Sequence, residues 1–183
     1  MMSDKTNLDL SILKIALLLT ALDGHVDDSE YDMFTQLASA CHIVSGDDVL
    51  KVLDNMKRPV EELVALAKEG DEKKLLAAFV SRTDSVCDWV LFANEPELAK
   101  QAFAMWTAMA MADDDYCETE RKAIRLLQAR INAVPRVNDA YLDLAERSIS
   151  ELRRLHQKLA KVKTTEEKVR IRARGEELMS MLE

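Results

Sequence analysis

The stretch "ALDGHVDDSE" at residues 21–30 and the stretch "MADDDYCETE" at residues 111–120 decide how the chain is organised. A shift of ninety positions places Asp23 on Asp113. Each stretch follows an apolar segment with helical spacing and precedes an amphipathic one, so each is an acidic turn between two expected helices. A single repeat at this distance is a duplication inside a domain rather than a repeat array. We therefore expect two similar helix–acidic turn–helix halves.

The composition favours helices along the whole chain. Of the 183 residues, 48% are hydrophobic and 32% charged, and only four are Gly and three Pro. Such a composition supports a core and contains few helix breakers. The expected fold class is all-α, with a helical bundle over residues 1–137. Residues 138–183 are expected to add a charged C-terminal extension, either one long helix or a helical hairpin.

Capping signals place the first two helices around the first acidic turn. We expect a helix over about residues 7–23, ended by Gly24 in the left-handed conformation. Asp27 then caps the next helix, and Glu30 three residues later completes a variant capping box. That second helix is expected to bury Tyr31. In the second half Cys117 stands where Asp27 stands in the first, and we expect it to be a poor cap.

Further boundaries follow from proline and polar residues. Pro59 suits the first turn of a helix that ends at Gly70, and Asp71 is expected to cap the helix after it. Asn94, followed by Glu97 three residues later, is expected to cap a helix that runs to Asp113.

The charge is distributed unevenly. The net charge is −8, and residues 138–183 hold ten Lys or Arg and nine Asp or Glu, so residues 1–137 carry about −9. This balance argues against nucleic acid as a partner of the whole molecule. The tail still has a basic stretch, because residues 153–174 hold nine Lys or Arg and two Glu. Three interpretations are open: a solvated helix whose Lys and Arg pair with Glu or dock on the acidic body, a partner-binding coiled coil or homodimer seam, and a segment that binds nucleic acid or an anionic membrane surface.

Cysteine usage and hydropathy indicate the cellular context. Three cysteines without close spacing, Cys41, Cys87 and Cys117, indicate reduced thiols rather than a disulfide framework. The apolar segment over residues 8–22 contains charged residues and is too short to span a bilayer, and its flank lacks the features of a signal peptide. We expect a cytoplasmic protein without an integral membrane segment.

The acids in the two turns have a structural and a functional interpretation. Acidic residues at a helix start stabilise the helix by roughly 0.3–1 kcal/mol each, which accounts for capping residues without any ligand. Asp23 and Asp113 are different, because they are expected at the C-terminal end of a helix, where negative charge is unfavourable. They need another partner: backbone N–H groups, a basic side chain or a hard cation such as Ca²⁺ or Mg²⁺. A calcium EF-hand is excluded, since the sixth loop position is not Gly and Glu30 comes too early.

The pattern Ala-x-Asp-Gly-x-Val-x-x-x-Glu in the first turn, with "MAMADDDYCETERKAI" at residues 109–124 for the second, resembles the TerB-like domain of tellurite-resistance proteins and of DnaJ-like membrane co-chaperones. The resemblance covers about residues 8–134 in layout. It implies an all-helical fold of two similar halves, and an adaptor role in stress-response assemblies. It also implies a divalent cation (Mg²⁺, Ca²⁺ or Mn²⁺) held by Asp23, Asp27, Glu30, Asp113 and Glu120.

No motif in the chain indicates catalysis. There is no GxSxG, Cys/His signature, P-loop or GxGxxG pattern. We therefore expect a non-enzymatic cytoplasmic adaptor whose paired acidic turns bind a divalent cation or a basic segment of a protein partner. The alternatives are a metal-dependent enzyme that uses the same acids, and a purely structural oligomerisation module that forms a homodimer through residues 138–183.

Overall fold

A computed structural model describes residues 4–26, 28–41, 45–113, 116–131 and 137–182. Within these ranges the chain forms nine helices and no strand, which confirms the all-α fold class. The helices are α1 (Asp4–Leu19), α2 (Asp28–Ala40), α3 (Gly46–Glu69), α4 (Glu72–Val86), α5 (Trp89–Ala93), α6 (Pro96–Ala110), α7 (Glu118–Arg130), α8 (Asp139–Lys161) and α9 (Thr165–Leu182).

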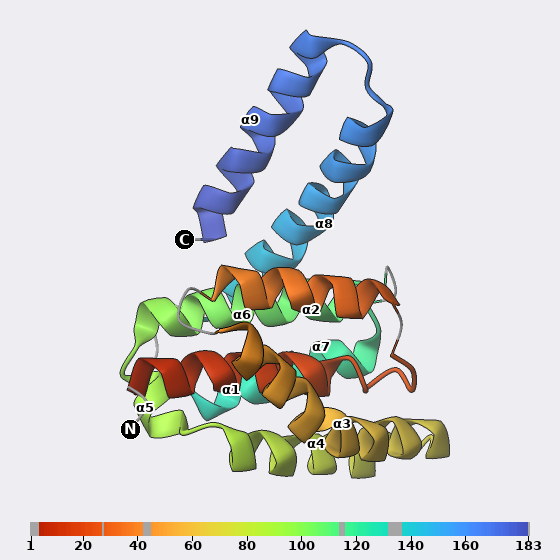
Figure 1. The fold of residues 1–183 in the computed structure, drawn as a ribbon, viewed down its shortest axis with the longest axis vertical. Helices are drawn as coiled ribbons and strands as arrows, with labels where there is room; N and C mark the ends of the chain where they lie inside the picture. Colours follow the sequence, from red (N-terminus) through yellow and green to blue (C-terminus); the bar gives the residue numbers. More distant parts are fainter. Residues whose placement is uncertain (1–3, 27, 42–44, 114–115, 132–136, 183) are drawn as a thin grey trace.

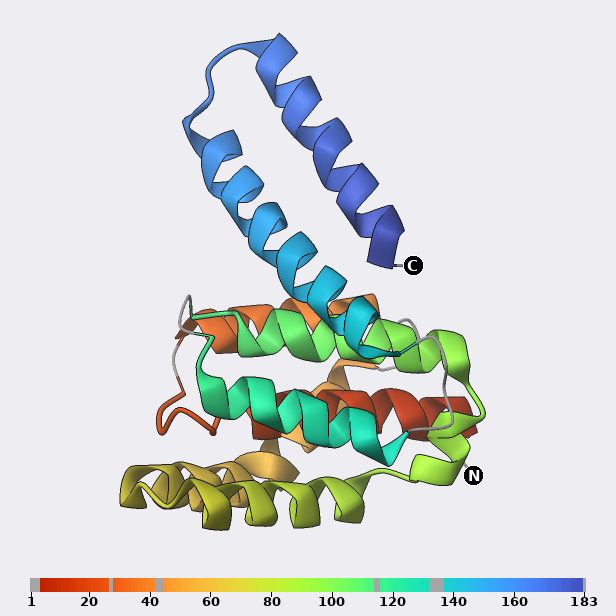
Figure 2. The ribbon, with the colours of Figure 1, turned by 180° about the vertical axis from the view of Figure 1, so that it is seen from behind.

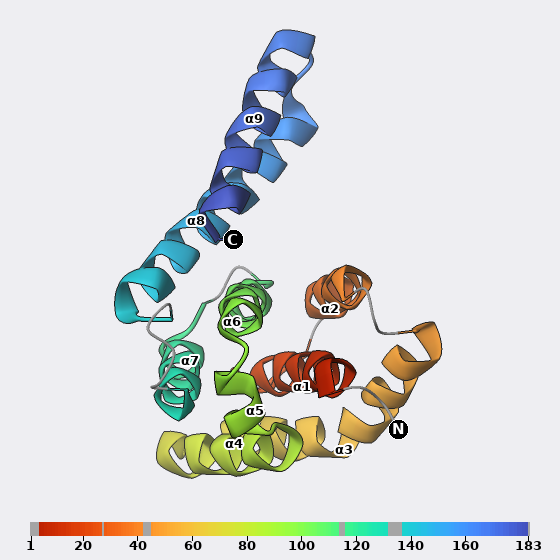
Figure 3. The same ribbon diagram turned by 90° about the vertical axis from the view of Figure 1, so that its left-hand side faces the viewer.

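Helix α1 forms the centre of the bundle. It packs against α2, α3, α4 and α6, and Figure 3 shows it enclosed between α2 and α6 on one side and α3 and α4 on the other. From Ile12 to Leu19 every side chain except that of Lys14 is buried. A helix that is apolar on nearly all sides must be covered on all sides, and the order of the other helices around α1 satisfies that requirement.

An aromatic cluster joins α1 to α6. The indole Nε1–H of Trp106 donates a hydrogen bond of 3.0 Å to the main-chain carbonyl of Ile12, ninety-four residues away in sequence. Phe92 stacks on the Trp106 ring and Phe103 meets it edge-on. All these rings are fully buried, so the indole N–H needs this partner, and the bond fixes α6 in register along α1.

Helices α8 and α9 form an antiparallel hairpin, the second of the two forms expected for residues 138–183. Figures 1 and 2 show the hairpin standing out from the bundle, with the start of α8 packed on α6 and its far end away from the other helices. Ala145 and Ile149 of α8 and Leu182 of α9 form a small apolar cluster there, against α6 side chains. No described helix is long and apolar enough to cross a membrane.

Several predicted boundaries agree with the structure. Gly24 and Gly70 have positive φ angles of 94° and 77°. Asp71 caps α4 by accepting the N–H of Lys74 at 3.0 Å. The first helix is shorter than expected: α1 ends at Leu19. Beyond it, turn-type hydrogen bonds between residues three apart join Leu22 to Leu19 and Gly24 to Ala21.

Three local predictions were wrong. Pro59 does not begin a helix but lies inside α3, and Figure 3 shows that α3 changes direction along its length, as a proline ring that clashes with the preceding turn requires. Glu95, not Asn94, precedes the first residue of α6, because Pro96 occupies the position that favours proline. Tyr31 is half exposed, since α3 leaves that side of α2 uncovered.

Candidate cation site at the paired acidic turns

The two acidic turns begin in the same way. Beyond α1 the N–H of Leu22 bonds the carbonyl of Leu19 at 3.2 Å, and beyond α6 the N–H of Ala112 bonds that of Met109 at 3.0 Å. These bonds lie at positions ninety residues apart, so the repeat seen in the sequence is also a repeat in backbone structure. Helices α1 and α6 pack together and their turns lie at the same end of the bundle (Figure 1). Asp23 and Asp113, the residues that follow these two bonds, therefore come close together.

Asp23, His25 and Asp113 come together at this end. One ligand atom from each residue lies within 4.8 Å of the others. His25 Nδ1 is 2.8 Å from Asp23 Oδ2, and His25 Nε2 is 4.0 Å from Asp113 Oδ2. The carboxylate side chains are only 9% and 8% exposed, whereas the imidazole is 57% exposed. The histidine therefore covers the solvent side of two nearly buried acids.

Asp23 is the least satisfied of the three. Its Oδ1 accepts the main-chain N–H of His25 at 3.0 Å, which closes the turn. Its Oδ2 is buried and accepts no hydrogen bond, since the contact with His25 Nδ1 has the distance of an ion pair but not hydrogen-bond geometry. Burial raises the pKa of Asp23 despite the opposing His25 contacts, and the charge of Asp113 raises it further. The carboxylate is held at a free-energy cost that a positive ligand would offset.

Glu120 is buried beside this group and completes a cap. Its Oε2 accepts the N–H of Cys117 at 2.9 Å, while its own N–H points to the Cys117 sulfur at 3.5 Å. This is a capping box, so Cys117 does cap its helix, but only through a weak thiol acceptor, as expected of a poor cap; Glu120 returns the second bond. Burial raises the pKa of Glu120 to about 8; the hydrogen bonds from Cys117 lower it, and the charges of Asp113 and Asp23 add to the rise.

The structure brings together only some of the five acids predicted as ligands. Asp23 and Asp113 belong to the compact group, and Glu120 lies close enough for their charges to act on it. Glu30 is buried in the first turn of α2, at the position equivalent to Glu120. Asp27 lies outside the described residues.

His25 is the member of the compact group that the five predicted acids do not include. Its imidazole forms an ion pair with Asp23 and also reaches toward Asp113 in the other half of the molecule. The signal that could have identified it is its position two residues after the aspartate of the turn, where a main-chain bond to Asp23 directs the side chain back over that carboxylate.

Burial keeps the three cysteine thiols in the protonated form, which is a poor nucleophile. Burial raises the pKa of Cys117 and of Cys41 to about 11 each and that of Cys87 to about 12. At neutral pH such thiols stay protonated, and the protonated form neither attacks carbon nor binds metal well. The chemistry available at the paired turns is that of carboxylates and one imidazole.

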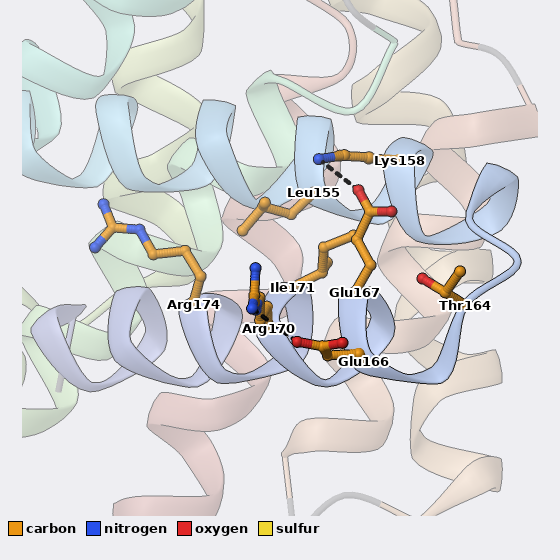
Figure 4. Close-up of a pocket in the computed structure, with 8 residues that line it drawn as sticks. All are labelled: Leu155, Lys158, Thr164, Glu166, Glu167, Arg170, Ile171 and Arg174. Carbon is orange, nitrogen blue, oxygen red and sulfur yellow. Dashed lines mark hydrogen bonds and ion pairs between the residues drawn. The ribbon is translucent and has the colours of Figure 1, made fainter.

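A hollow in the C-terminal hairpin is lined by charges of both signs, unlike the acidic group at the paired turns. It has a volume of about 420 Å³ and lies between the far ends of α8 and α9 (Figure 4). Lys158 pairs with Glu167 across it at 3.0 Å, and Arg170 pairs with Glu166 at 2.8 Å. The third cation on its walls, Arg174, pairs with Glu151 and Glu177 outside the hollow, so each charged group that lines the hollow already has a partner of opposite charge.

The chain matches no protein-family model, no curated protein and no solved structure at a significant level. The likeness to TerB-like domains therefore rests on the two turn motifs and on the helical layout.

Proposed function

We propose that this protein is a non-enzymatic cytoplasmic adaptor of the TerB-like type whose paired acidic turns bind one divalent cation. The observation that carries the proposal is the meeting of two nearly buried aspartates from opposite halves of the chain, one of them with a carboxylate oxygen that accepts no hydrogen bond. Buried charges of one sign repel in a medium of low dielectric constant, and a divalent cation between them reverses that repulsion.

The donor set points to a transition-metal cation. Two carboxylates alone suit Mg²⁺ and Ca²⁺, but the imidazole of His25 is a better ligand for transition metals. Of the cations expected from the sequence, Mn²⁺ is the one that accepts both oxygen and nitrogen donors. A cation at this position would favour the ionised form of the buried Glu120, which would then add negative charge next to the ion.

The proposed ion site adjoins a groove that could bind a protein partner. A groove of about 830 Å³ runs between α1, α2 and α3, and His25 and Val26 of the first turn line one end of it. Tyr31 and Leu50 on its walls are large, apolar and at least half exposed. An ion held by His25 would fix the turn that forms this end of the groove. In the adaptor we propose, the cation orders the groove for an apolar segment of a protein partner.

Calorimetric titration tests the site. Mn²⁺, Zn²⁺, Mg²⁺ and Ca²⁺ are added separately to the chelator-treated protein and to an Asp23→Asn/Asp113→Asn variant. We expect one saturable site, tightest for a transition metal, that the variant loses. Asn keeps the main-chain hydrogen bond of residue 23, so the fold survives. The matched control is Asp32→Asn/Asp47→Asn, which removes two exposed charges from α2 and α3 and should bind as the wild type does. Absence of heat with all four ions would leave only a capping role for the acids.

A second candidate function, self-association through residues 138–183, is favoured by one observation. Of the seven large hydrophobic side chains exposed in the described part of the chain, three lie on α9: Val169, Met179 and Met181. Light scattering should give twice the chain mass for the wild type and the single-chain mass for Val169→Ser/Met179→Ser. A monomeric wild type would rule out this role.

A further inference from the structure

The outer face of α9 presents an exposed stripe of mixed apolar and charged residues. The side of α9 that packs on α8 and α6 carries its buried residues, Ile171, Leu178 and Leu182. Val169 and Met179 lie away from that side and are 59% and 52% exposed. Four exposed residues follow helical spacing along this outer face and form what we call the α9 stripe: Val169, Arg172, Glu176 and Met179.

The hairpin fixes α9 in place. Arg174 donates two hydrogen bonds to Glu151 of α8, at 2.8 and 3.1 Å. At the other end of α9, the Tyr141 hydroxyl lies 3.2 Å from the carbonyl of Leu182. Figure 1 shows α9 running beside α8 along the hairpin. Because α9 is held on α8 in this way, its outer face can bind only another molecule.

The groove between α1, α2 and α3 presents a second stripe, on α3. Four residues with helical spacing line the groove and form what we call the α3 stripe: Leu50, Asp54, Lys57 and Val60. Leu50 is 65% exposed, the largest exposure of any apolar residue in this groove. The α3 stripe lies almost wholly before or at the change of direction near Pro59, so it is close to straight.

Each stripe carries one acid and one base that have no partner. Asp54 and Lys57 are three positions apart in α3, a spacing at which side chains of opposite charge can pair. Arg172 and Glu176 are four positions apart in α9, which allows the same. Neither pair forms, and none of these side chains makes an ion pair or a hydrogen bond with any residue that the structure describes. Two acids and two bases are therefore available for contacts between molecules.

We propose that the groove binds α9 of a second copy of this chain, with the two helices parallel. Both stripes span ten residues, and their members agree in position to within one residue, about 1.5 Å along the helix axis. In this register the two stripes meet in order: Val169 with Leu50, Arg172 with Asp54, Glu176 with Lys57, and Met179 with Val60.

The charges decide the direction of the bound helix. In the parallel arrangement each charged residue of α9 meets one of opposite sign. The antiparallel arrangement fits the spacing equally well, but it places Arg172 against Lys57 and Glu176 against Asp54. Like charges brought together in an interface are strongly unfavourable, so the parallel arrangement is selected. Each copy offers one groove and one α9 stripe, and two copies that exchange both contacts form a closed dimer.

This inference rests on the adaptor function proposed above, because it names the segment that the groove binds. It does not require the cation, since no member of either stripe belongs to the paired acidic turns. Self-association is therefore measured with Mn²⁺ and with a chelator. Dimers in the chelator support the inference even if the titration finds no cation site, and a monomer that still binds Mn²⁺ overturns the inference alone.

The experiment is light scattering of the protein over a wide range of concentration. Asp54→Arg and Arg172→Asp should each weaken the dimer by about tenfold or more, and the two changes in one chain should restore it to within about threefold. Both residues are exposed, so the fold tolerates the substitutions. The matched controls, Glu95→Arg and Lys161→Asp, reverse exposed charges outside both stripes and should change the affinity by less than about threefold.

Mixing two variants distinguishes this contact from a seam between two α9 helices. Leu50→Ser damages the groove, and Val169→Ser/Met179→Ser damages the α9 stripe. An equimolar mixture should contain more dimer than either variant alone, because one intact groove can bind one intact stripe. Three results would overturn the proposal: a monomeric wild type, a charge exchange that does not restore the dimer, or a mixture no more dimeric than its components.

Discussion

The two acidic turns share a spacing but differ in how they hold their acids. The first turn reverses at Gly24, with φ of 94°, and closes with a main-chain bond to the Asp23 carboxylate. The second turn has no glycine in the sequence from Met111 to Cys117, and its helix begins with a capping box between Cys117 and Glu120. The aspartates nevertheless meet, because α1 and α6 pack side by side. Helix packing brings the acids together, and the hydrogen bonds within each turn determine which carboxylate oxygen is left without a partner.

Because the two turns hold their acids differently, each half of the molecule contains one buried carboxyl group whose charged form is unfavourable. In the first half it is Asp23, which has one oxygen without a hydrogen bond. In the second half it is Glu120, whose pKa rises to about 8 although both of its cap bonds are made. Three substitutions, one in the first turn and two in the second, test how each turn affects the stability of the fold.

The largest effect is expected from Glu120→Gln in chelator-treated protein. A carboxyl whose pKa rises from 4.5 to about 8 on folding stabilises the fold below pH 4.5, and that contribution disappears as the pH rises toward 8. The wild type should therefore lose about 1 kcal/mol of unfolding free energy per pH unit in this window. Gln keeps the bond from Cys117 without the charge, so the variant should be more stable by about 3 kcal/mol at pH 8.5 and equal at pH 4.5.

Urea denaturation at pH 4.5, 6.5 and 8.5 measures this difference. Glu176→Gln, an exposed acid on α9, is the control and should keep the wild-type slope. Identical pH slopes for the wild type and Glu120→Gln would mean that the burial of Glu120 carries no such cost.

A smaller effect is expected from Gly24→Ala. A side chain at φ of 94° costs about 1–2 kcal/mol of unfolding free energy, and the added Cβ meets its nearest atoms at an ordinary 3.6 Å, so backbone strain is the cause. Gly46→Ala, where nothing lies within 4 Å and φ is not positive, is the control and should be neutral or slightly stabilising. Thermal unfolding compares the two. An unaffected Gly24→Ala variant would show that the first turn adopts another backbone conformation at no cost.

The smallest effect is expected from Cys117→Ser. A hydroxyl is a stronger acceptor than a thiol at the start of a helix, so the variant should gain about 0.5–1 kcal/mol. Cys41→Ser, at a half-buried position that caps no helix start, should gain nothing. A decrease in melting temperature for Cys117→Ser would mean that the sulfur contributes packing rather than capping.

Single-residue signals made most of the fold predictable. Gly24 and Gly70 end helical segments because glycine tolerates positive φ, and Asp71 caps because its carboxylate reaches the next turn. The errors arose where two signals competed. Pro96 outweighed the capping preference of Asn94, and the uninterrupted apolar face of α3 outweighed Pro59.

The candidate site was predictable only in part. The repeat of Asp23 in Asp113 indicated two acids of one kind, and helix packing made them neighbours. The place of His25 over the first turn and the burial of Glu120 depend on side-chain packing that no spacing rule expresses.

The burial of α1 has a consequence for synthesis of the protein. The ribosome releases this largely buried helix before α6, which carries its hydrogen-bonded partner Trp106 and follows about ninety residues later. Throughout that interval the face of α1 that packs on α6 has no cover. The packing of α6 on α1 is a long-range contact, and contacts between residues so far apart in sequence slow folding.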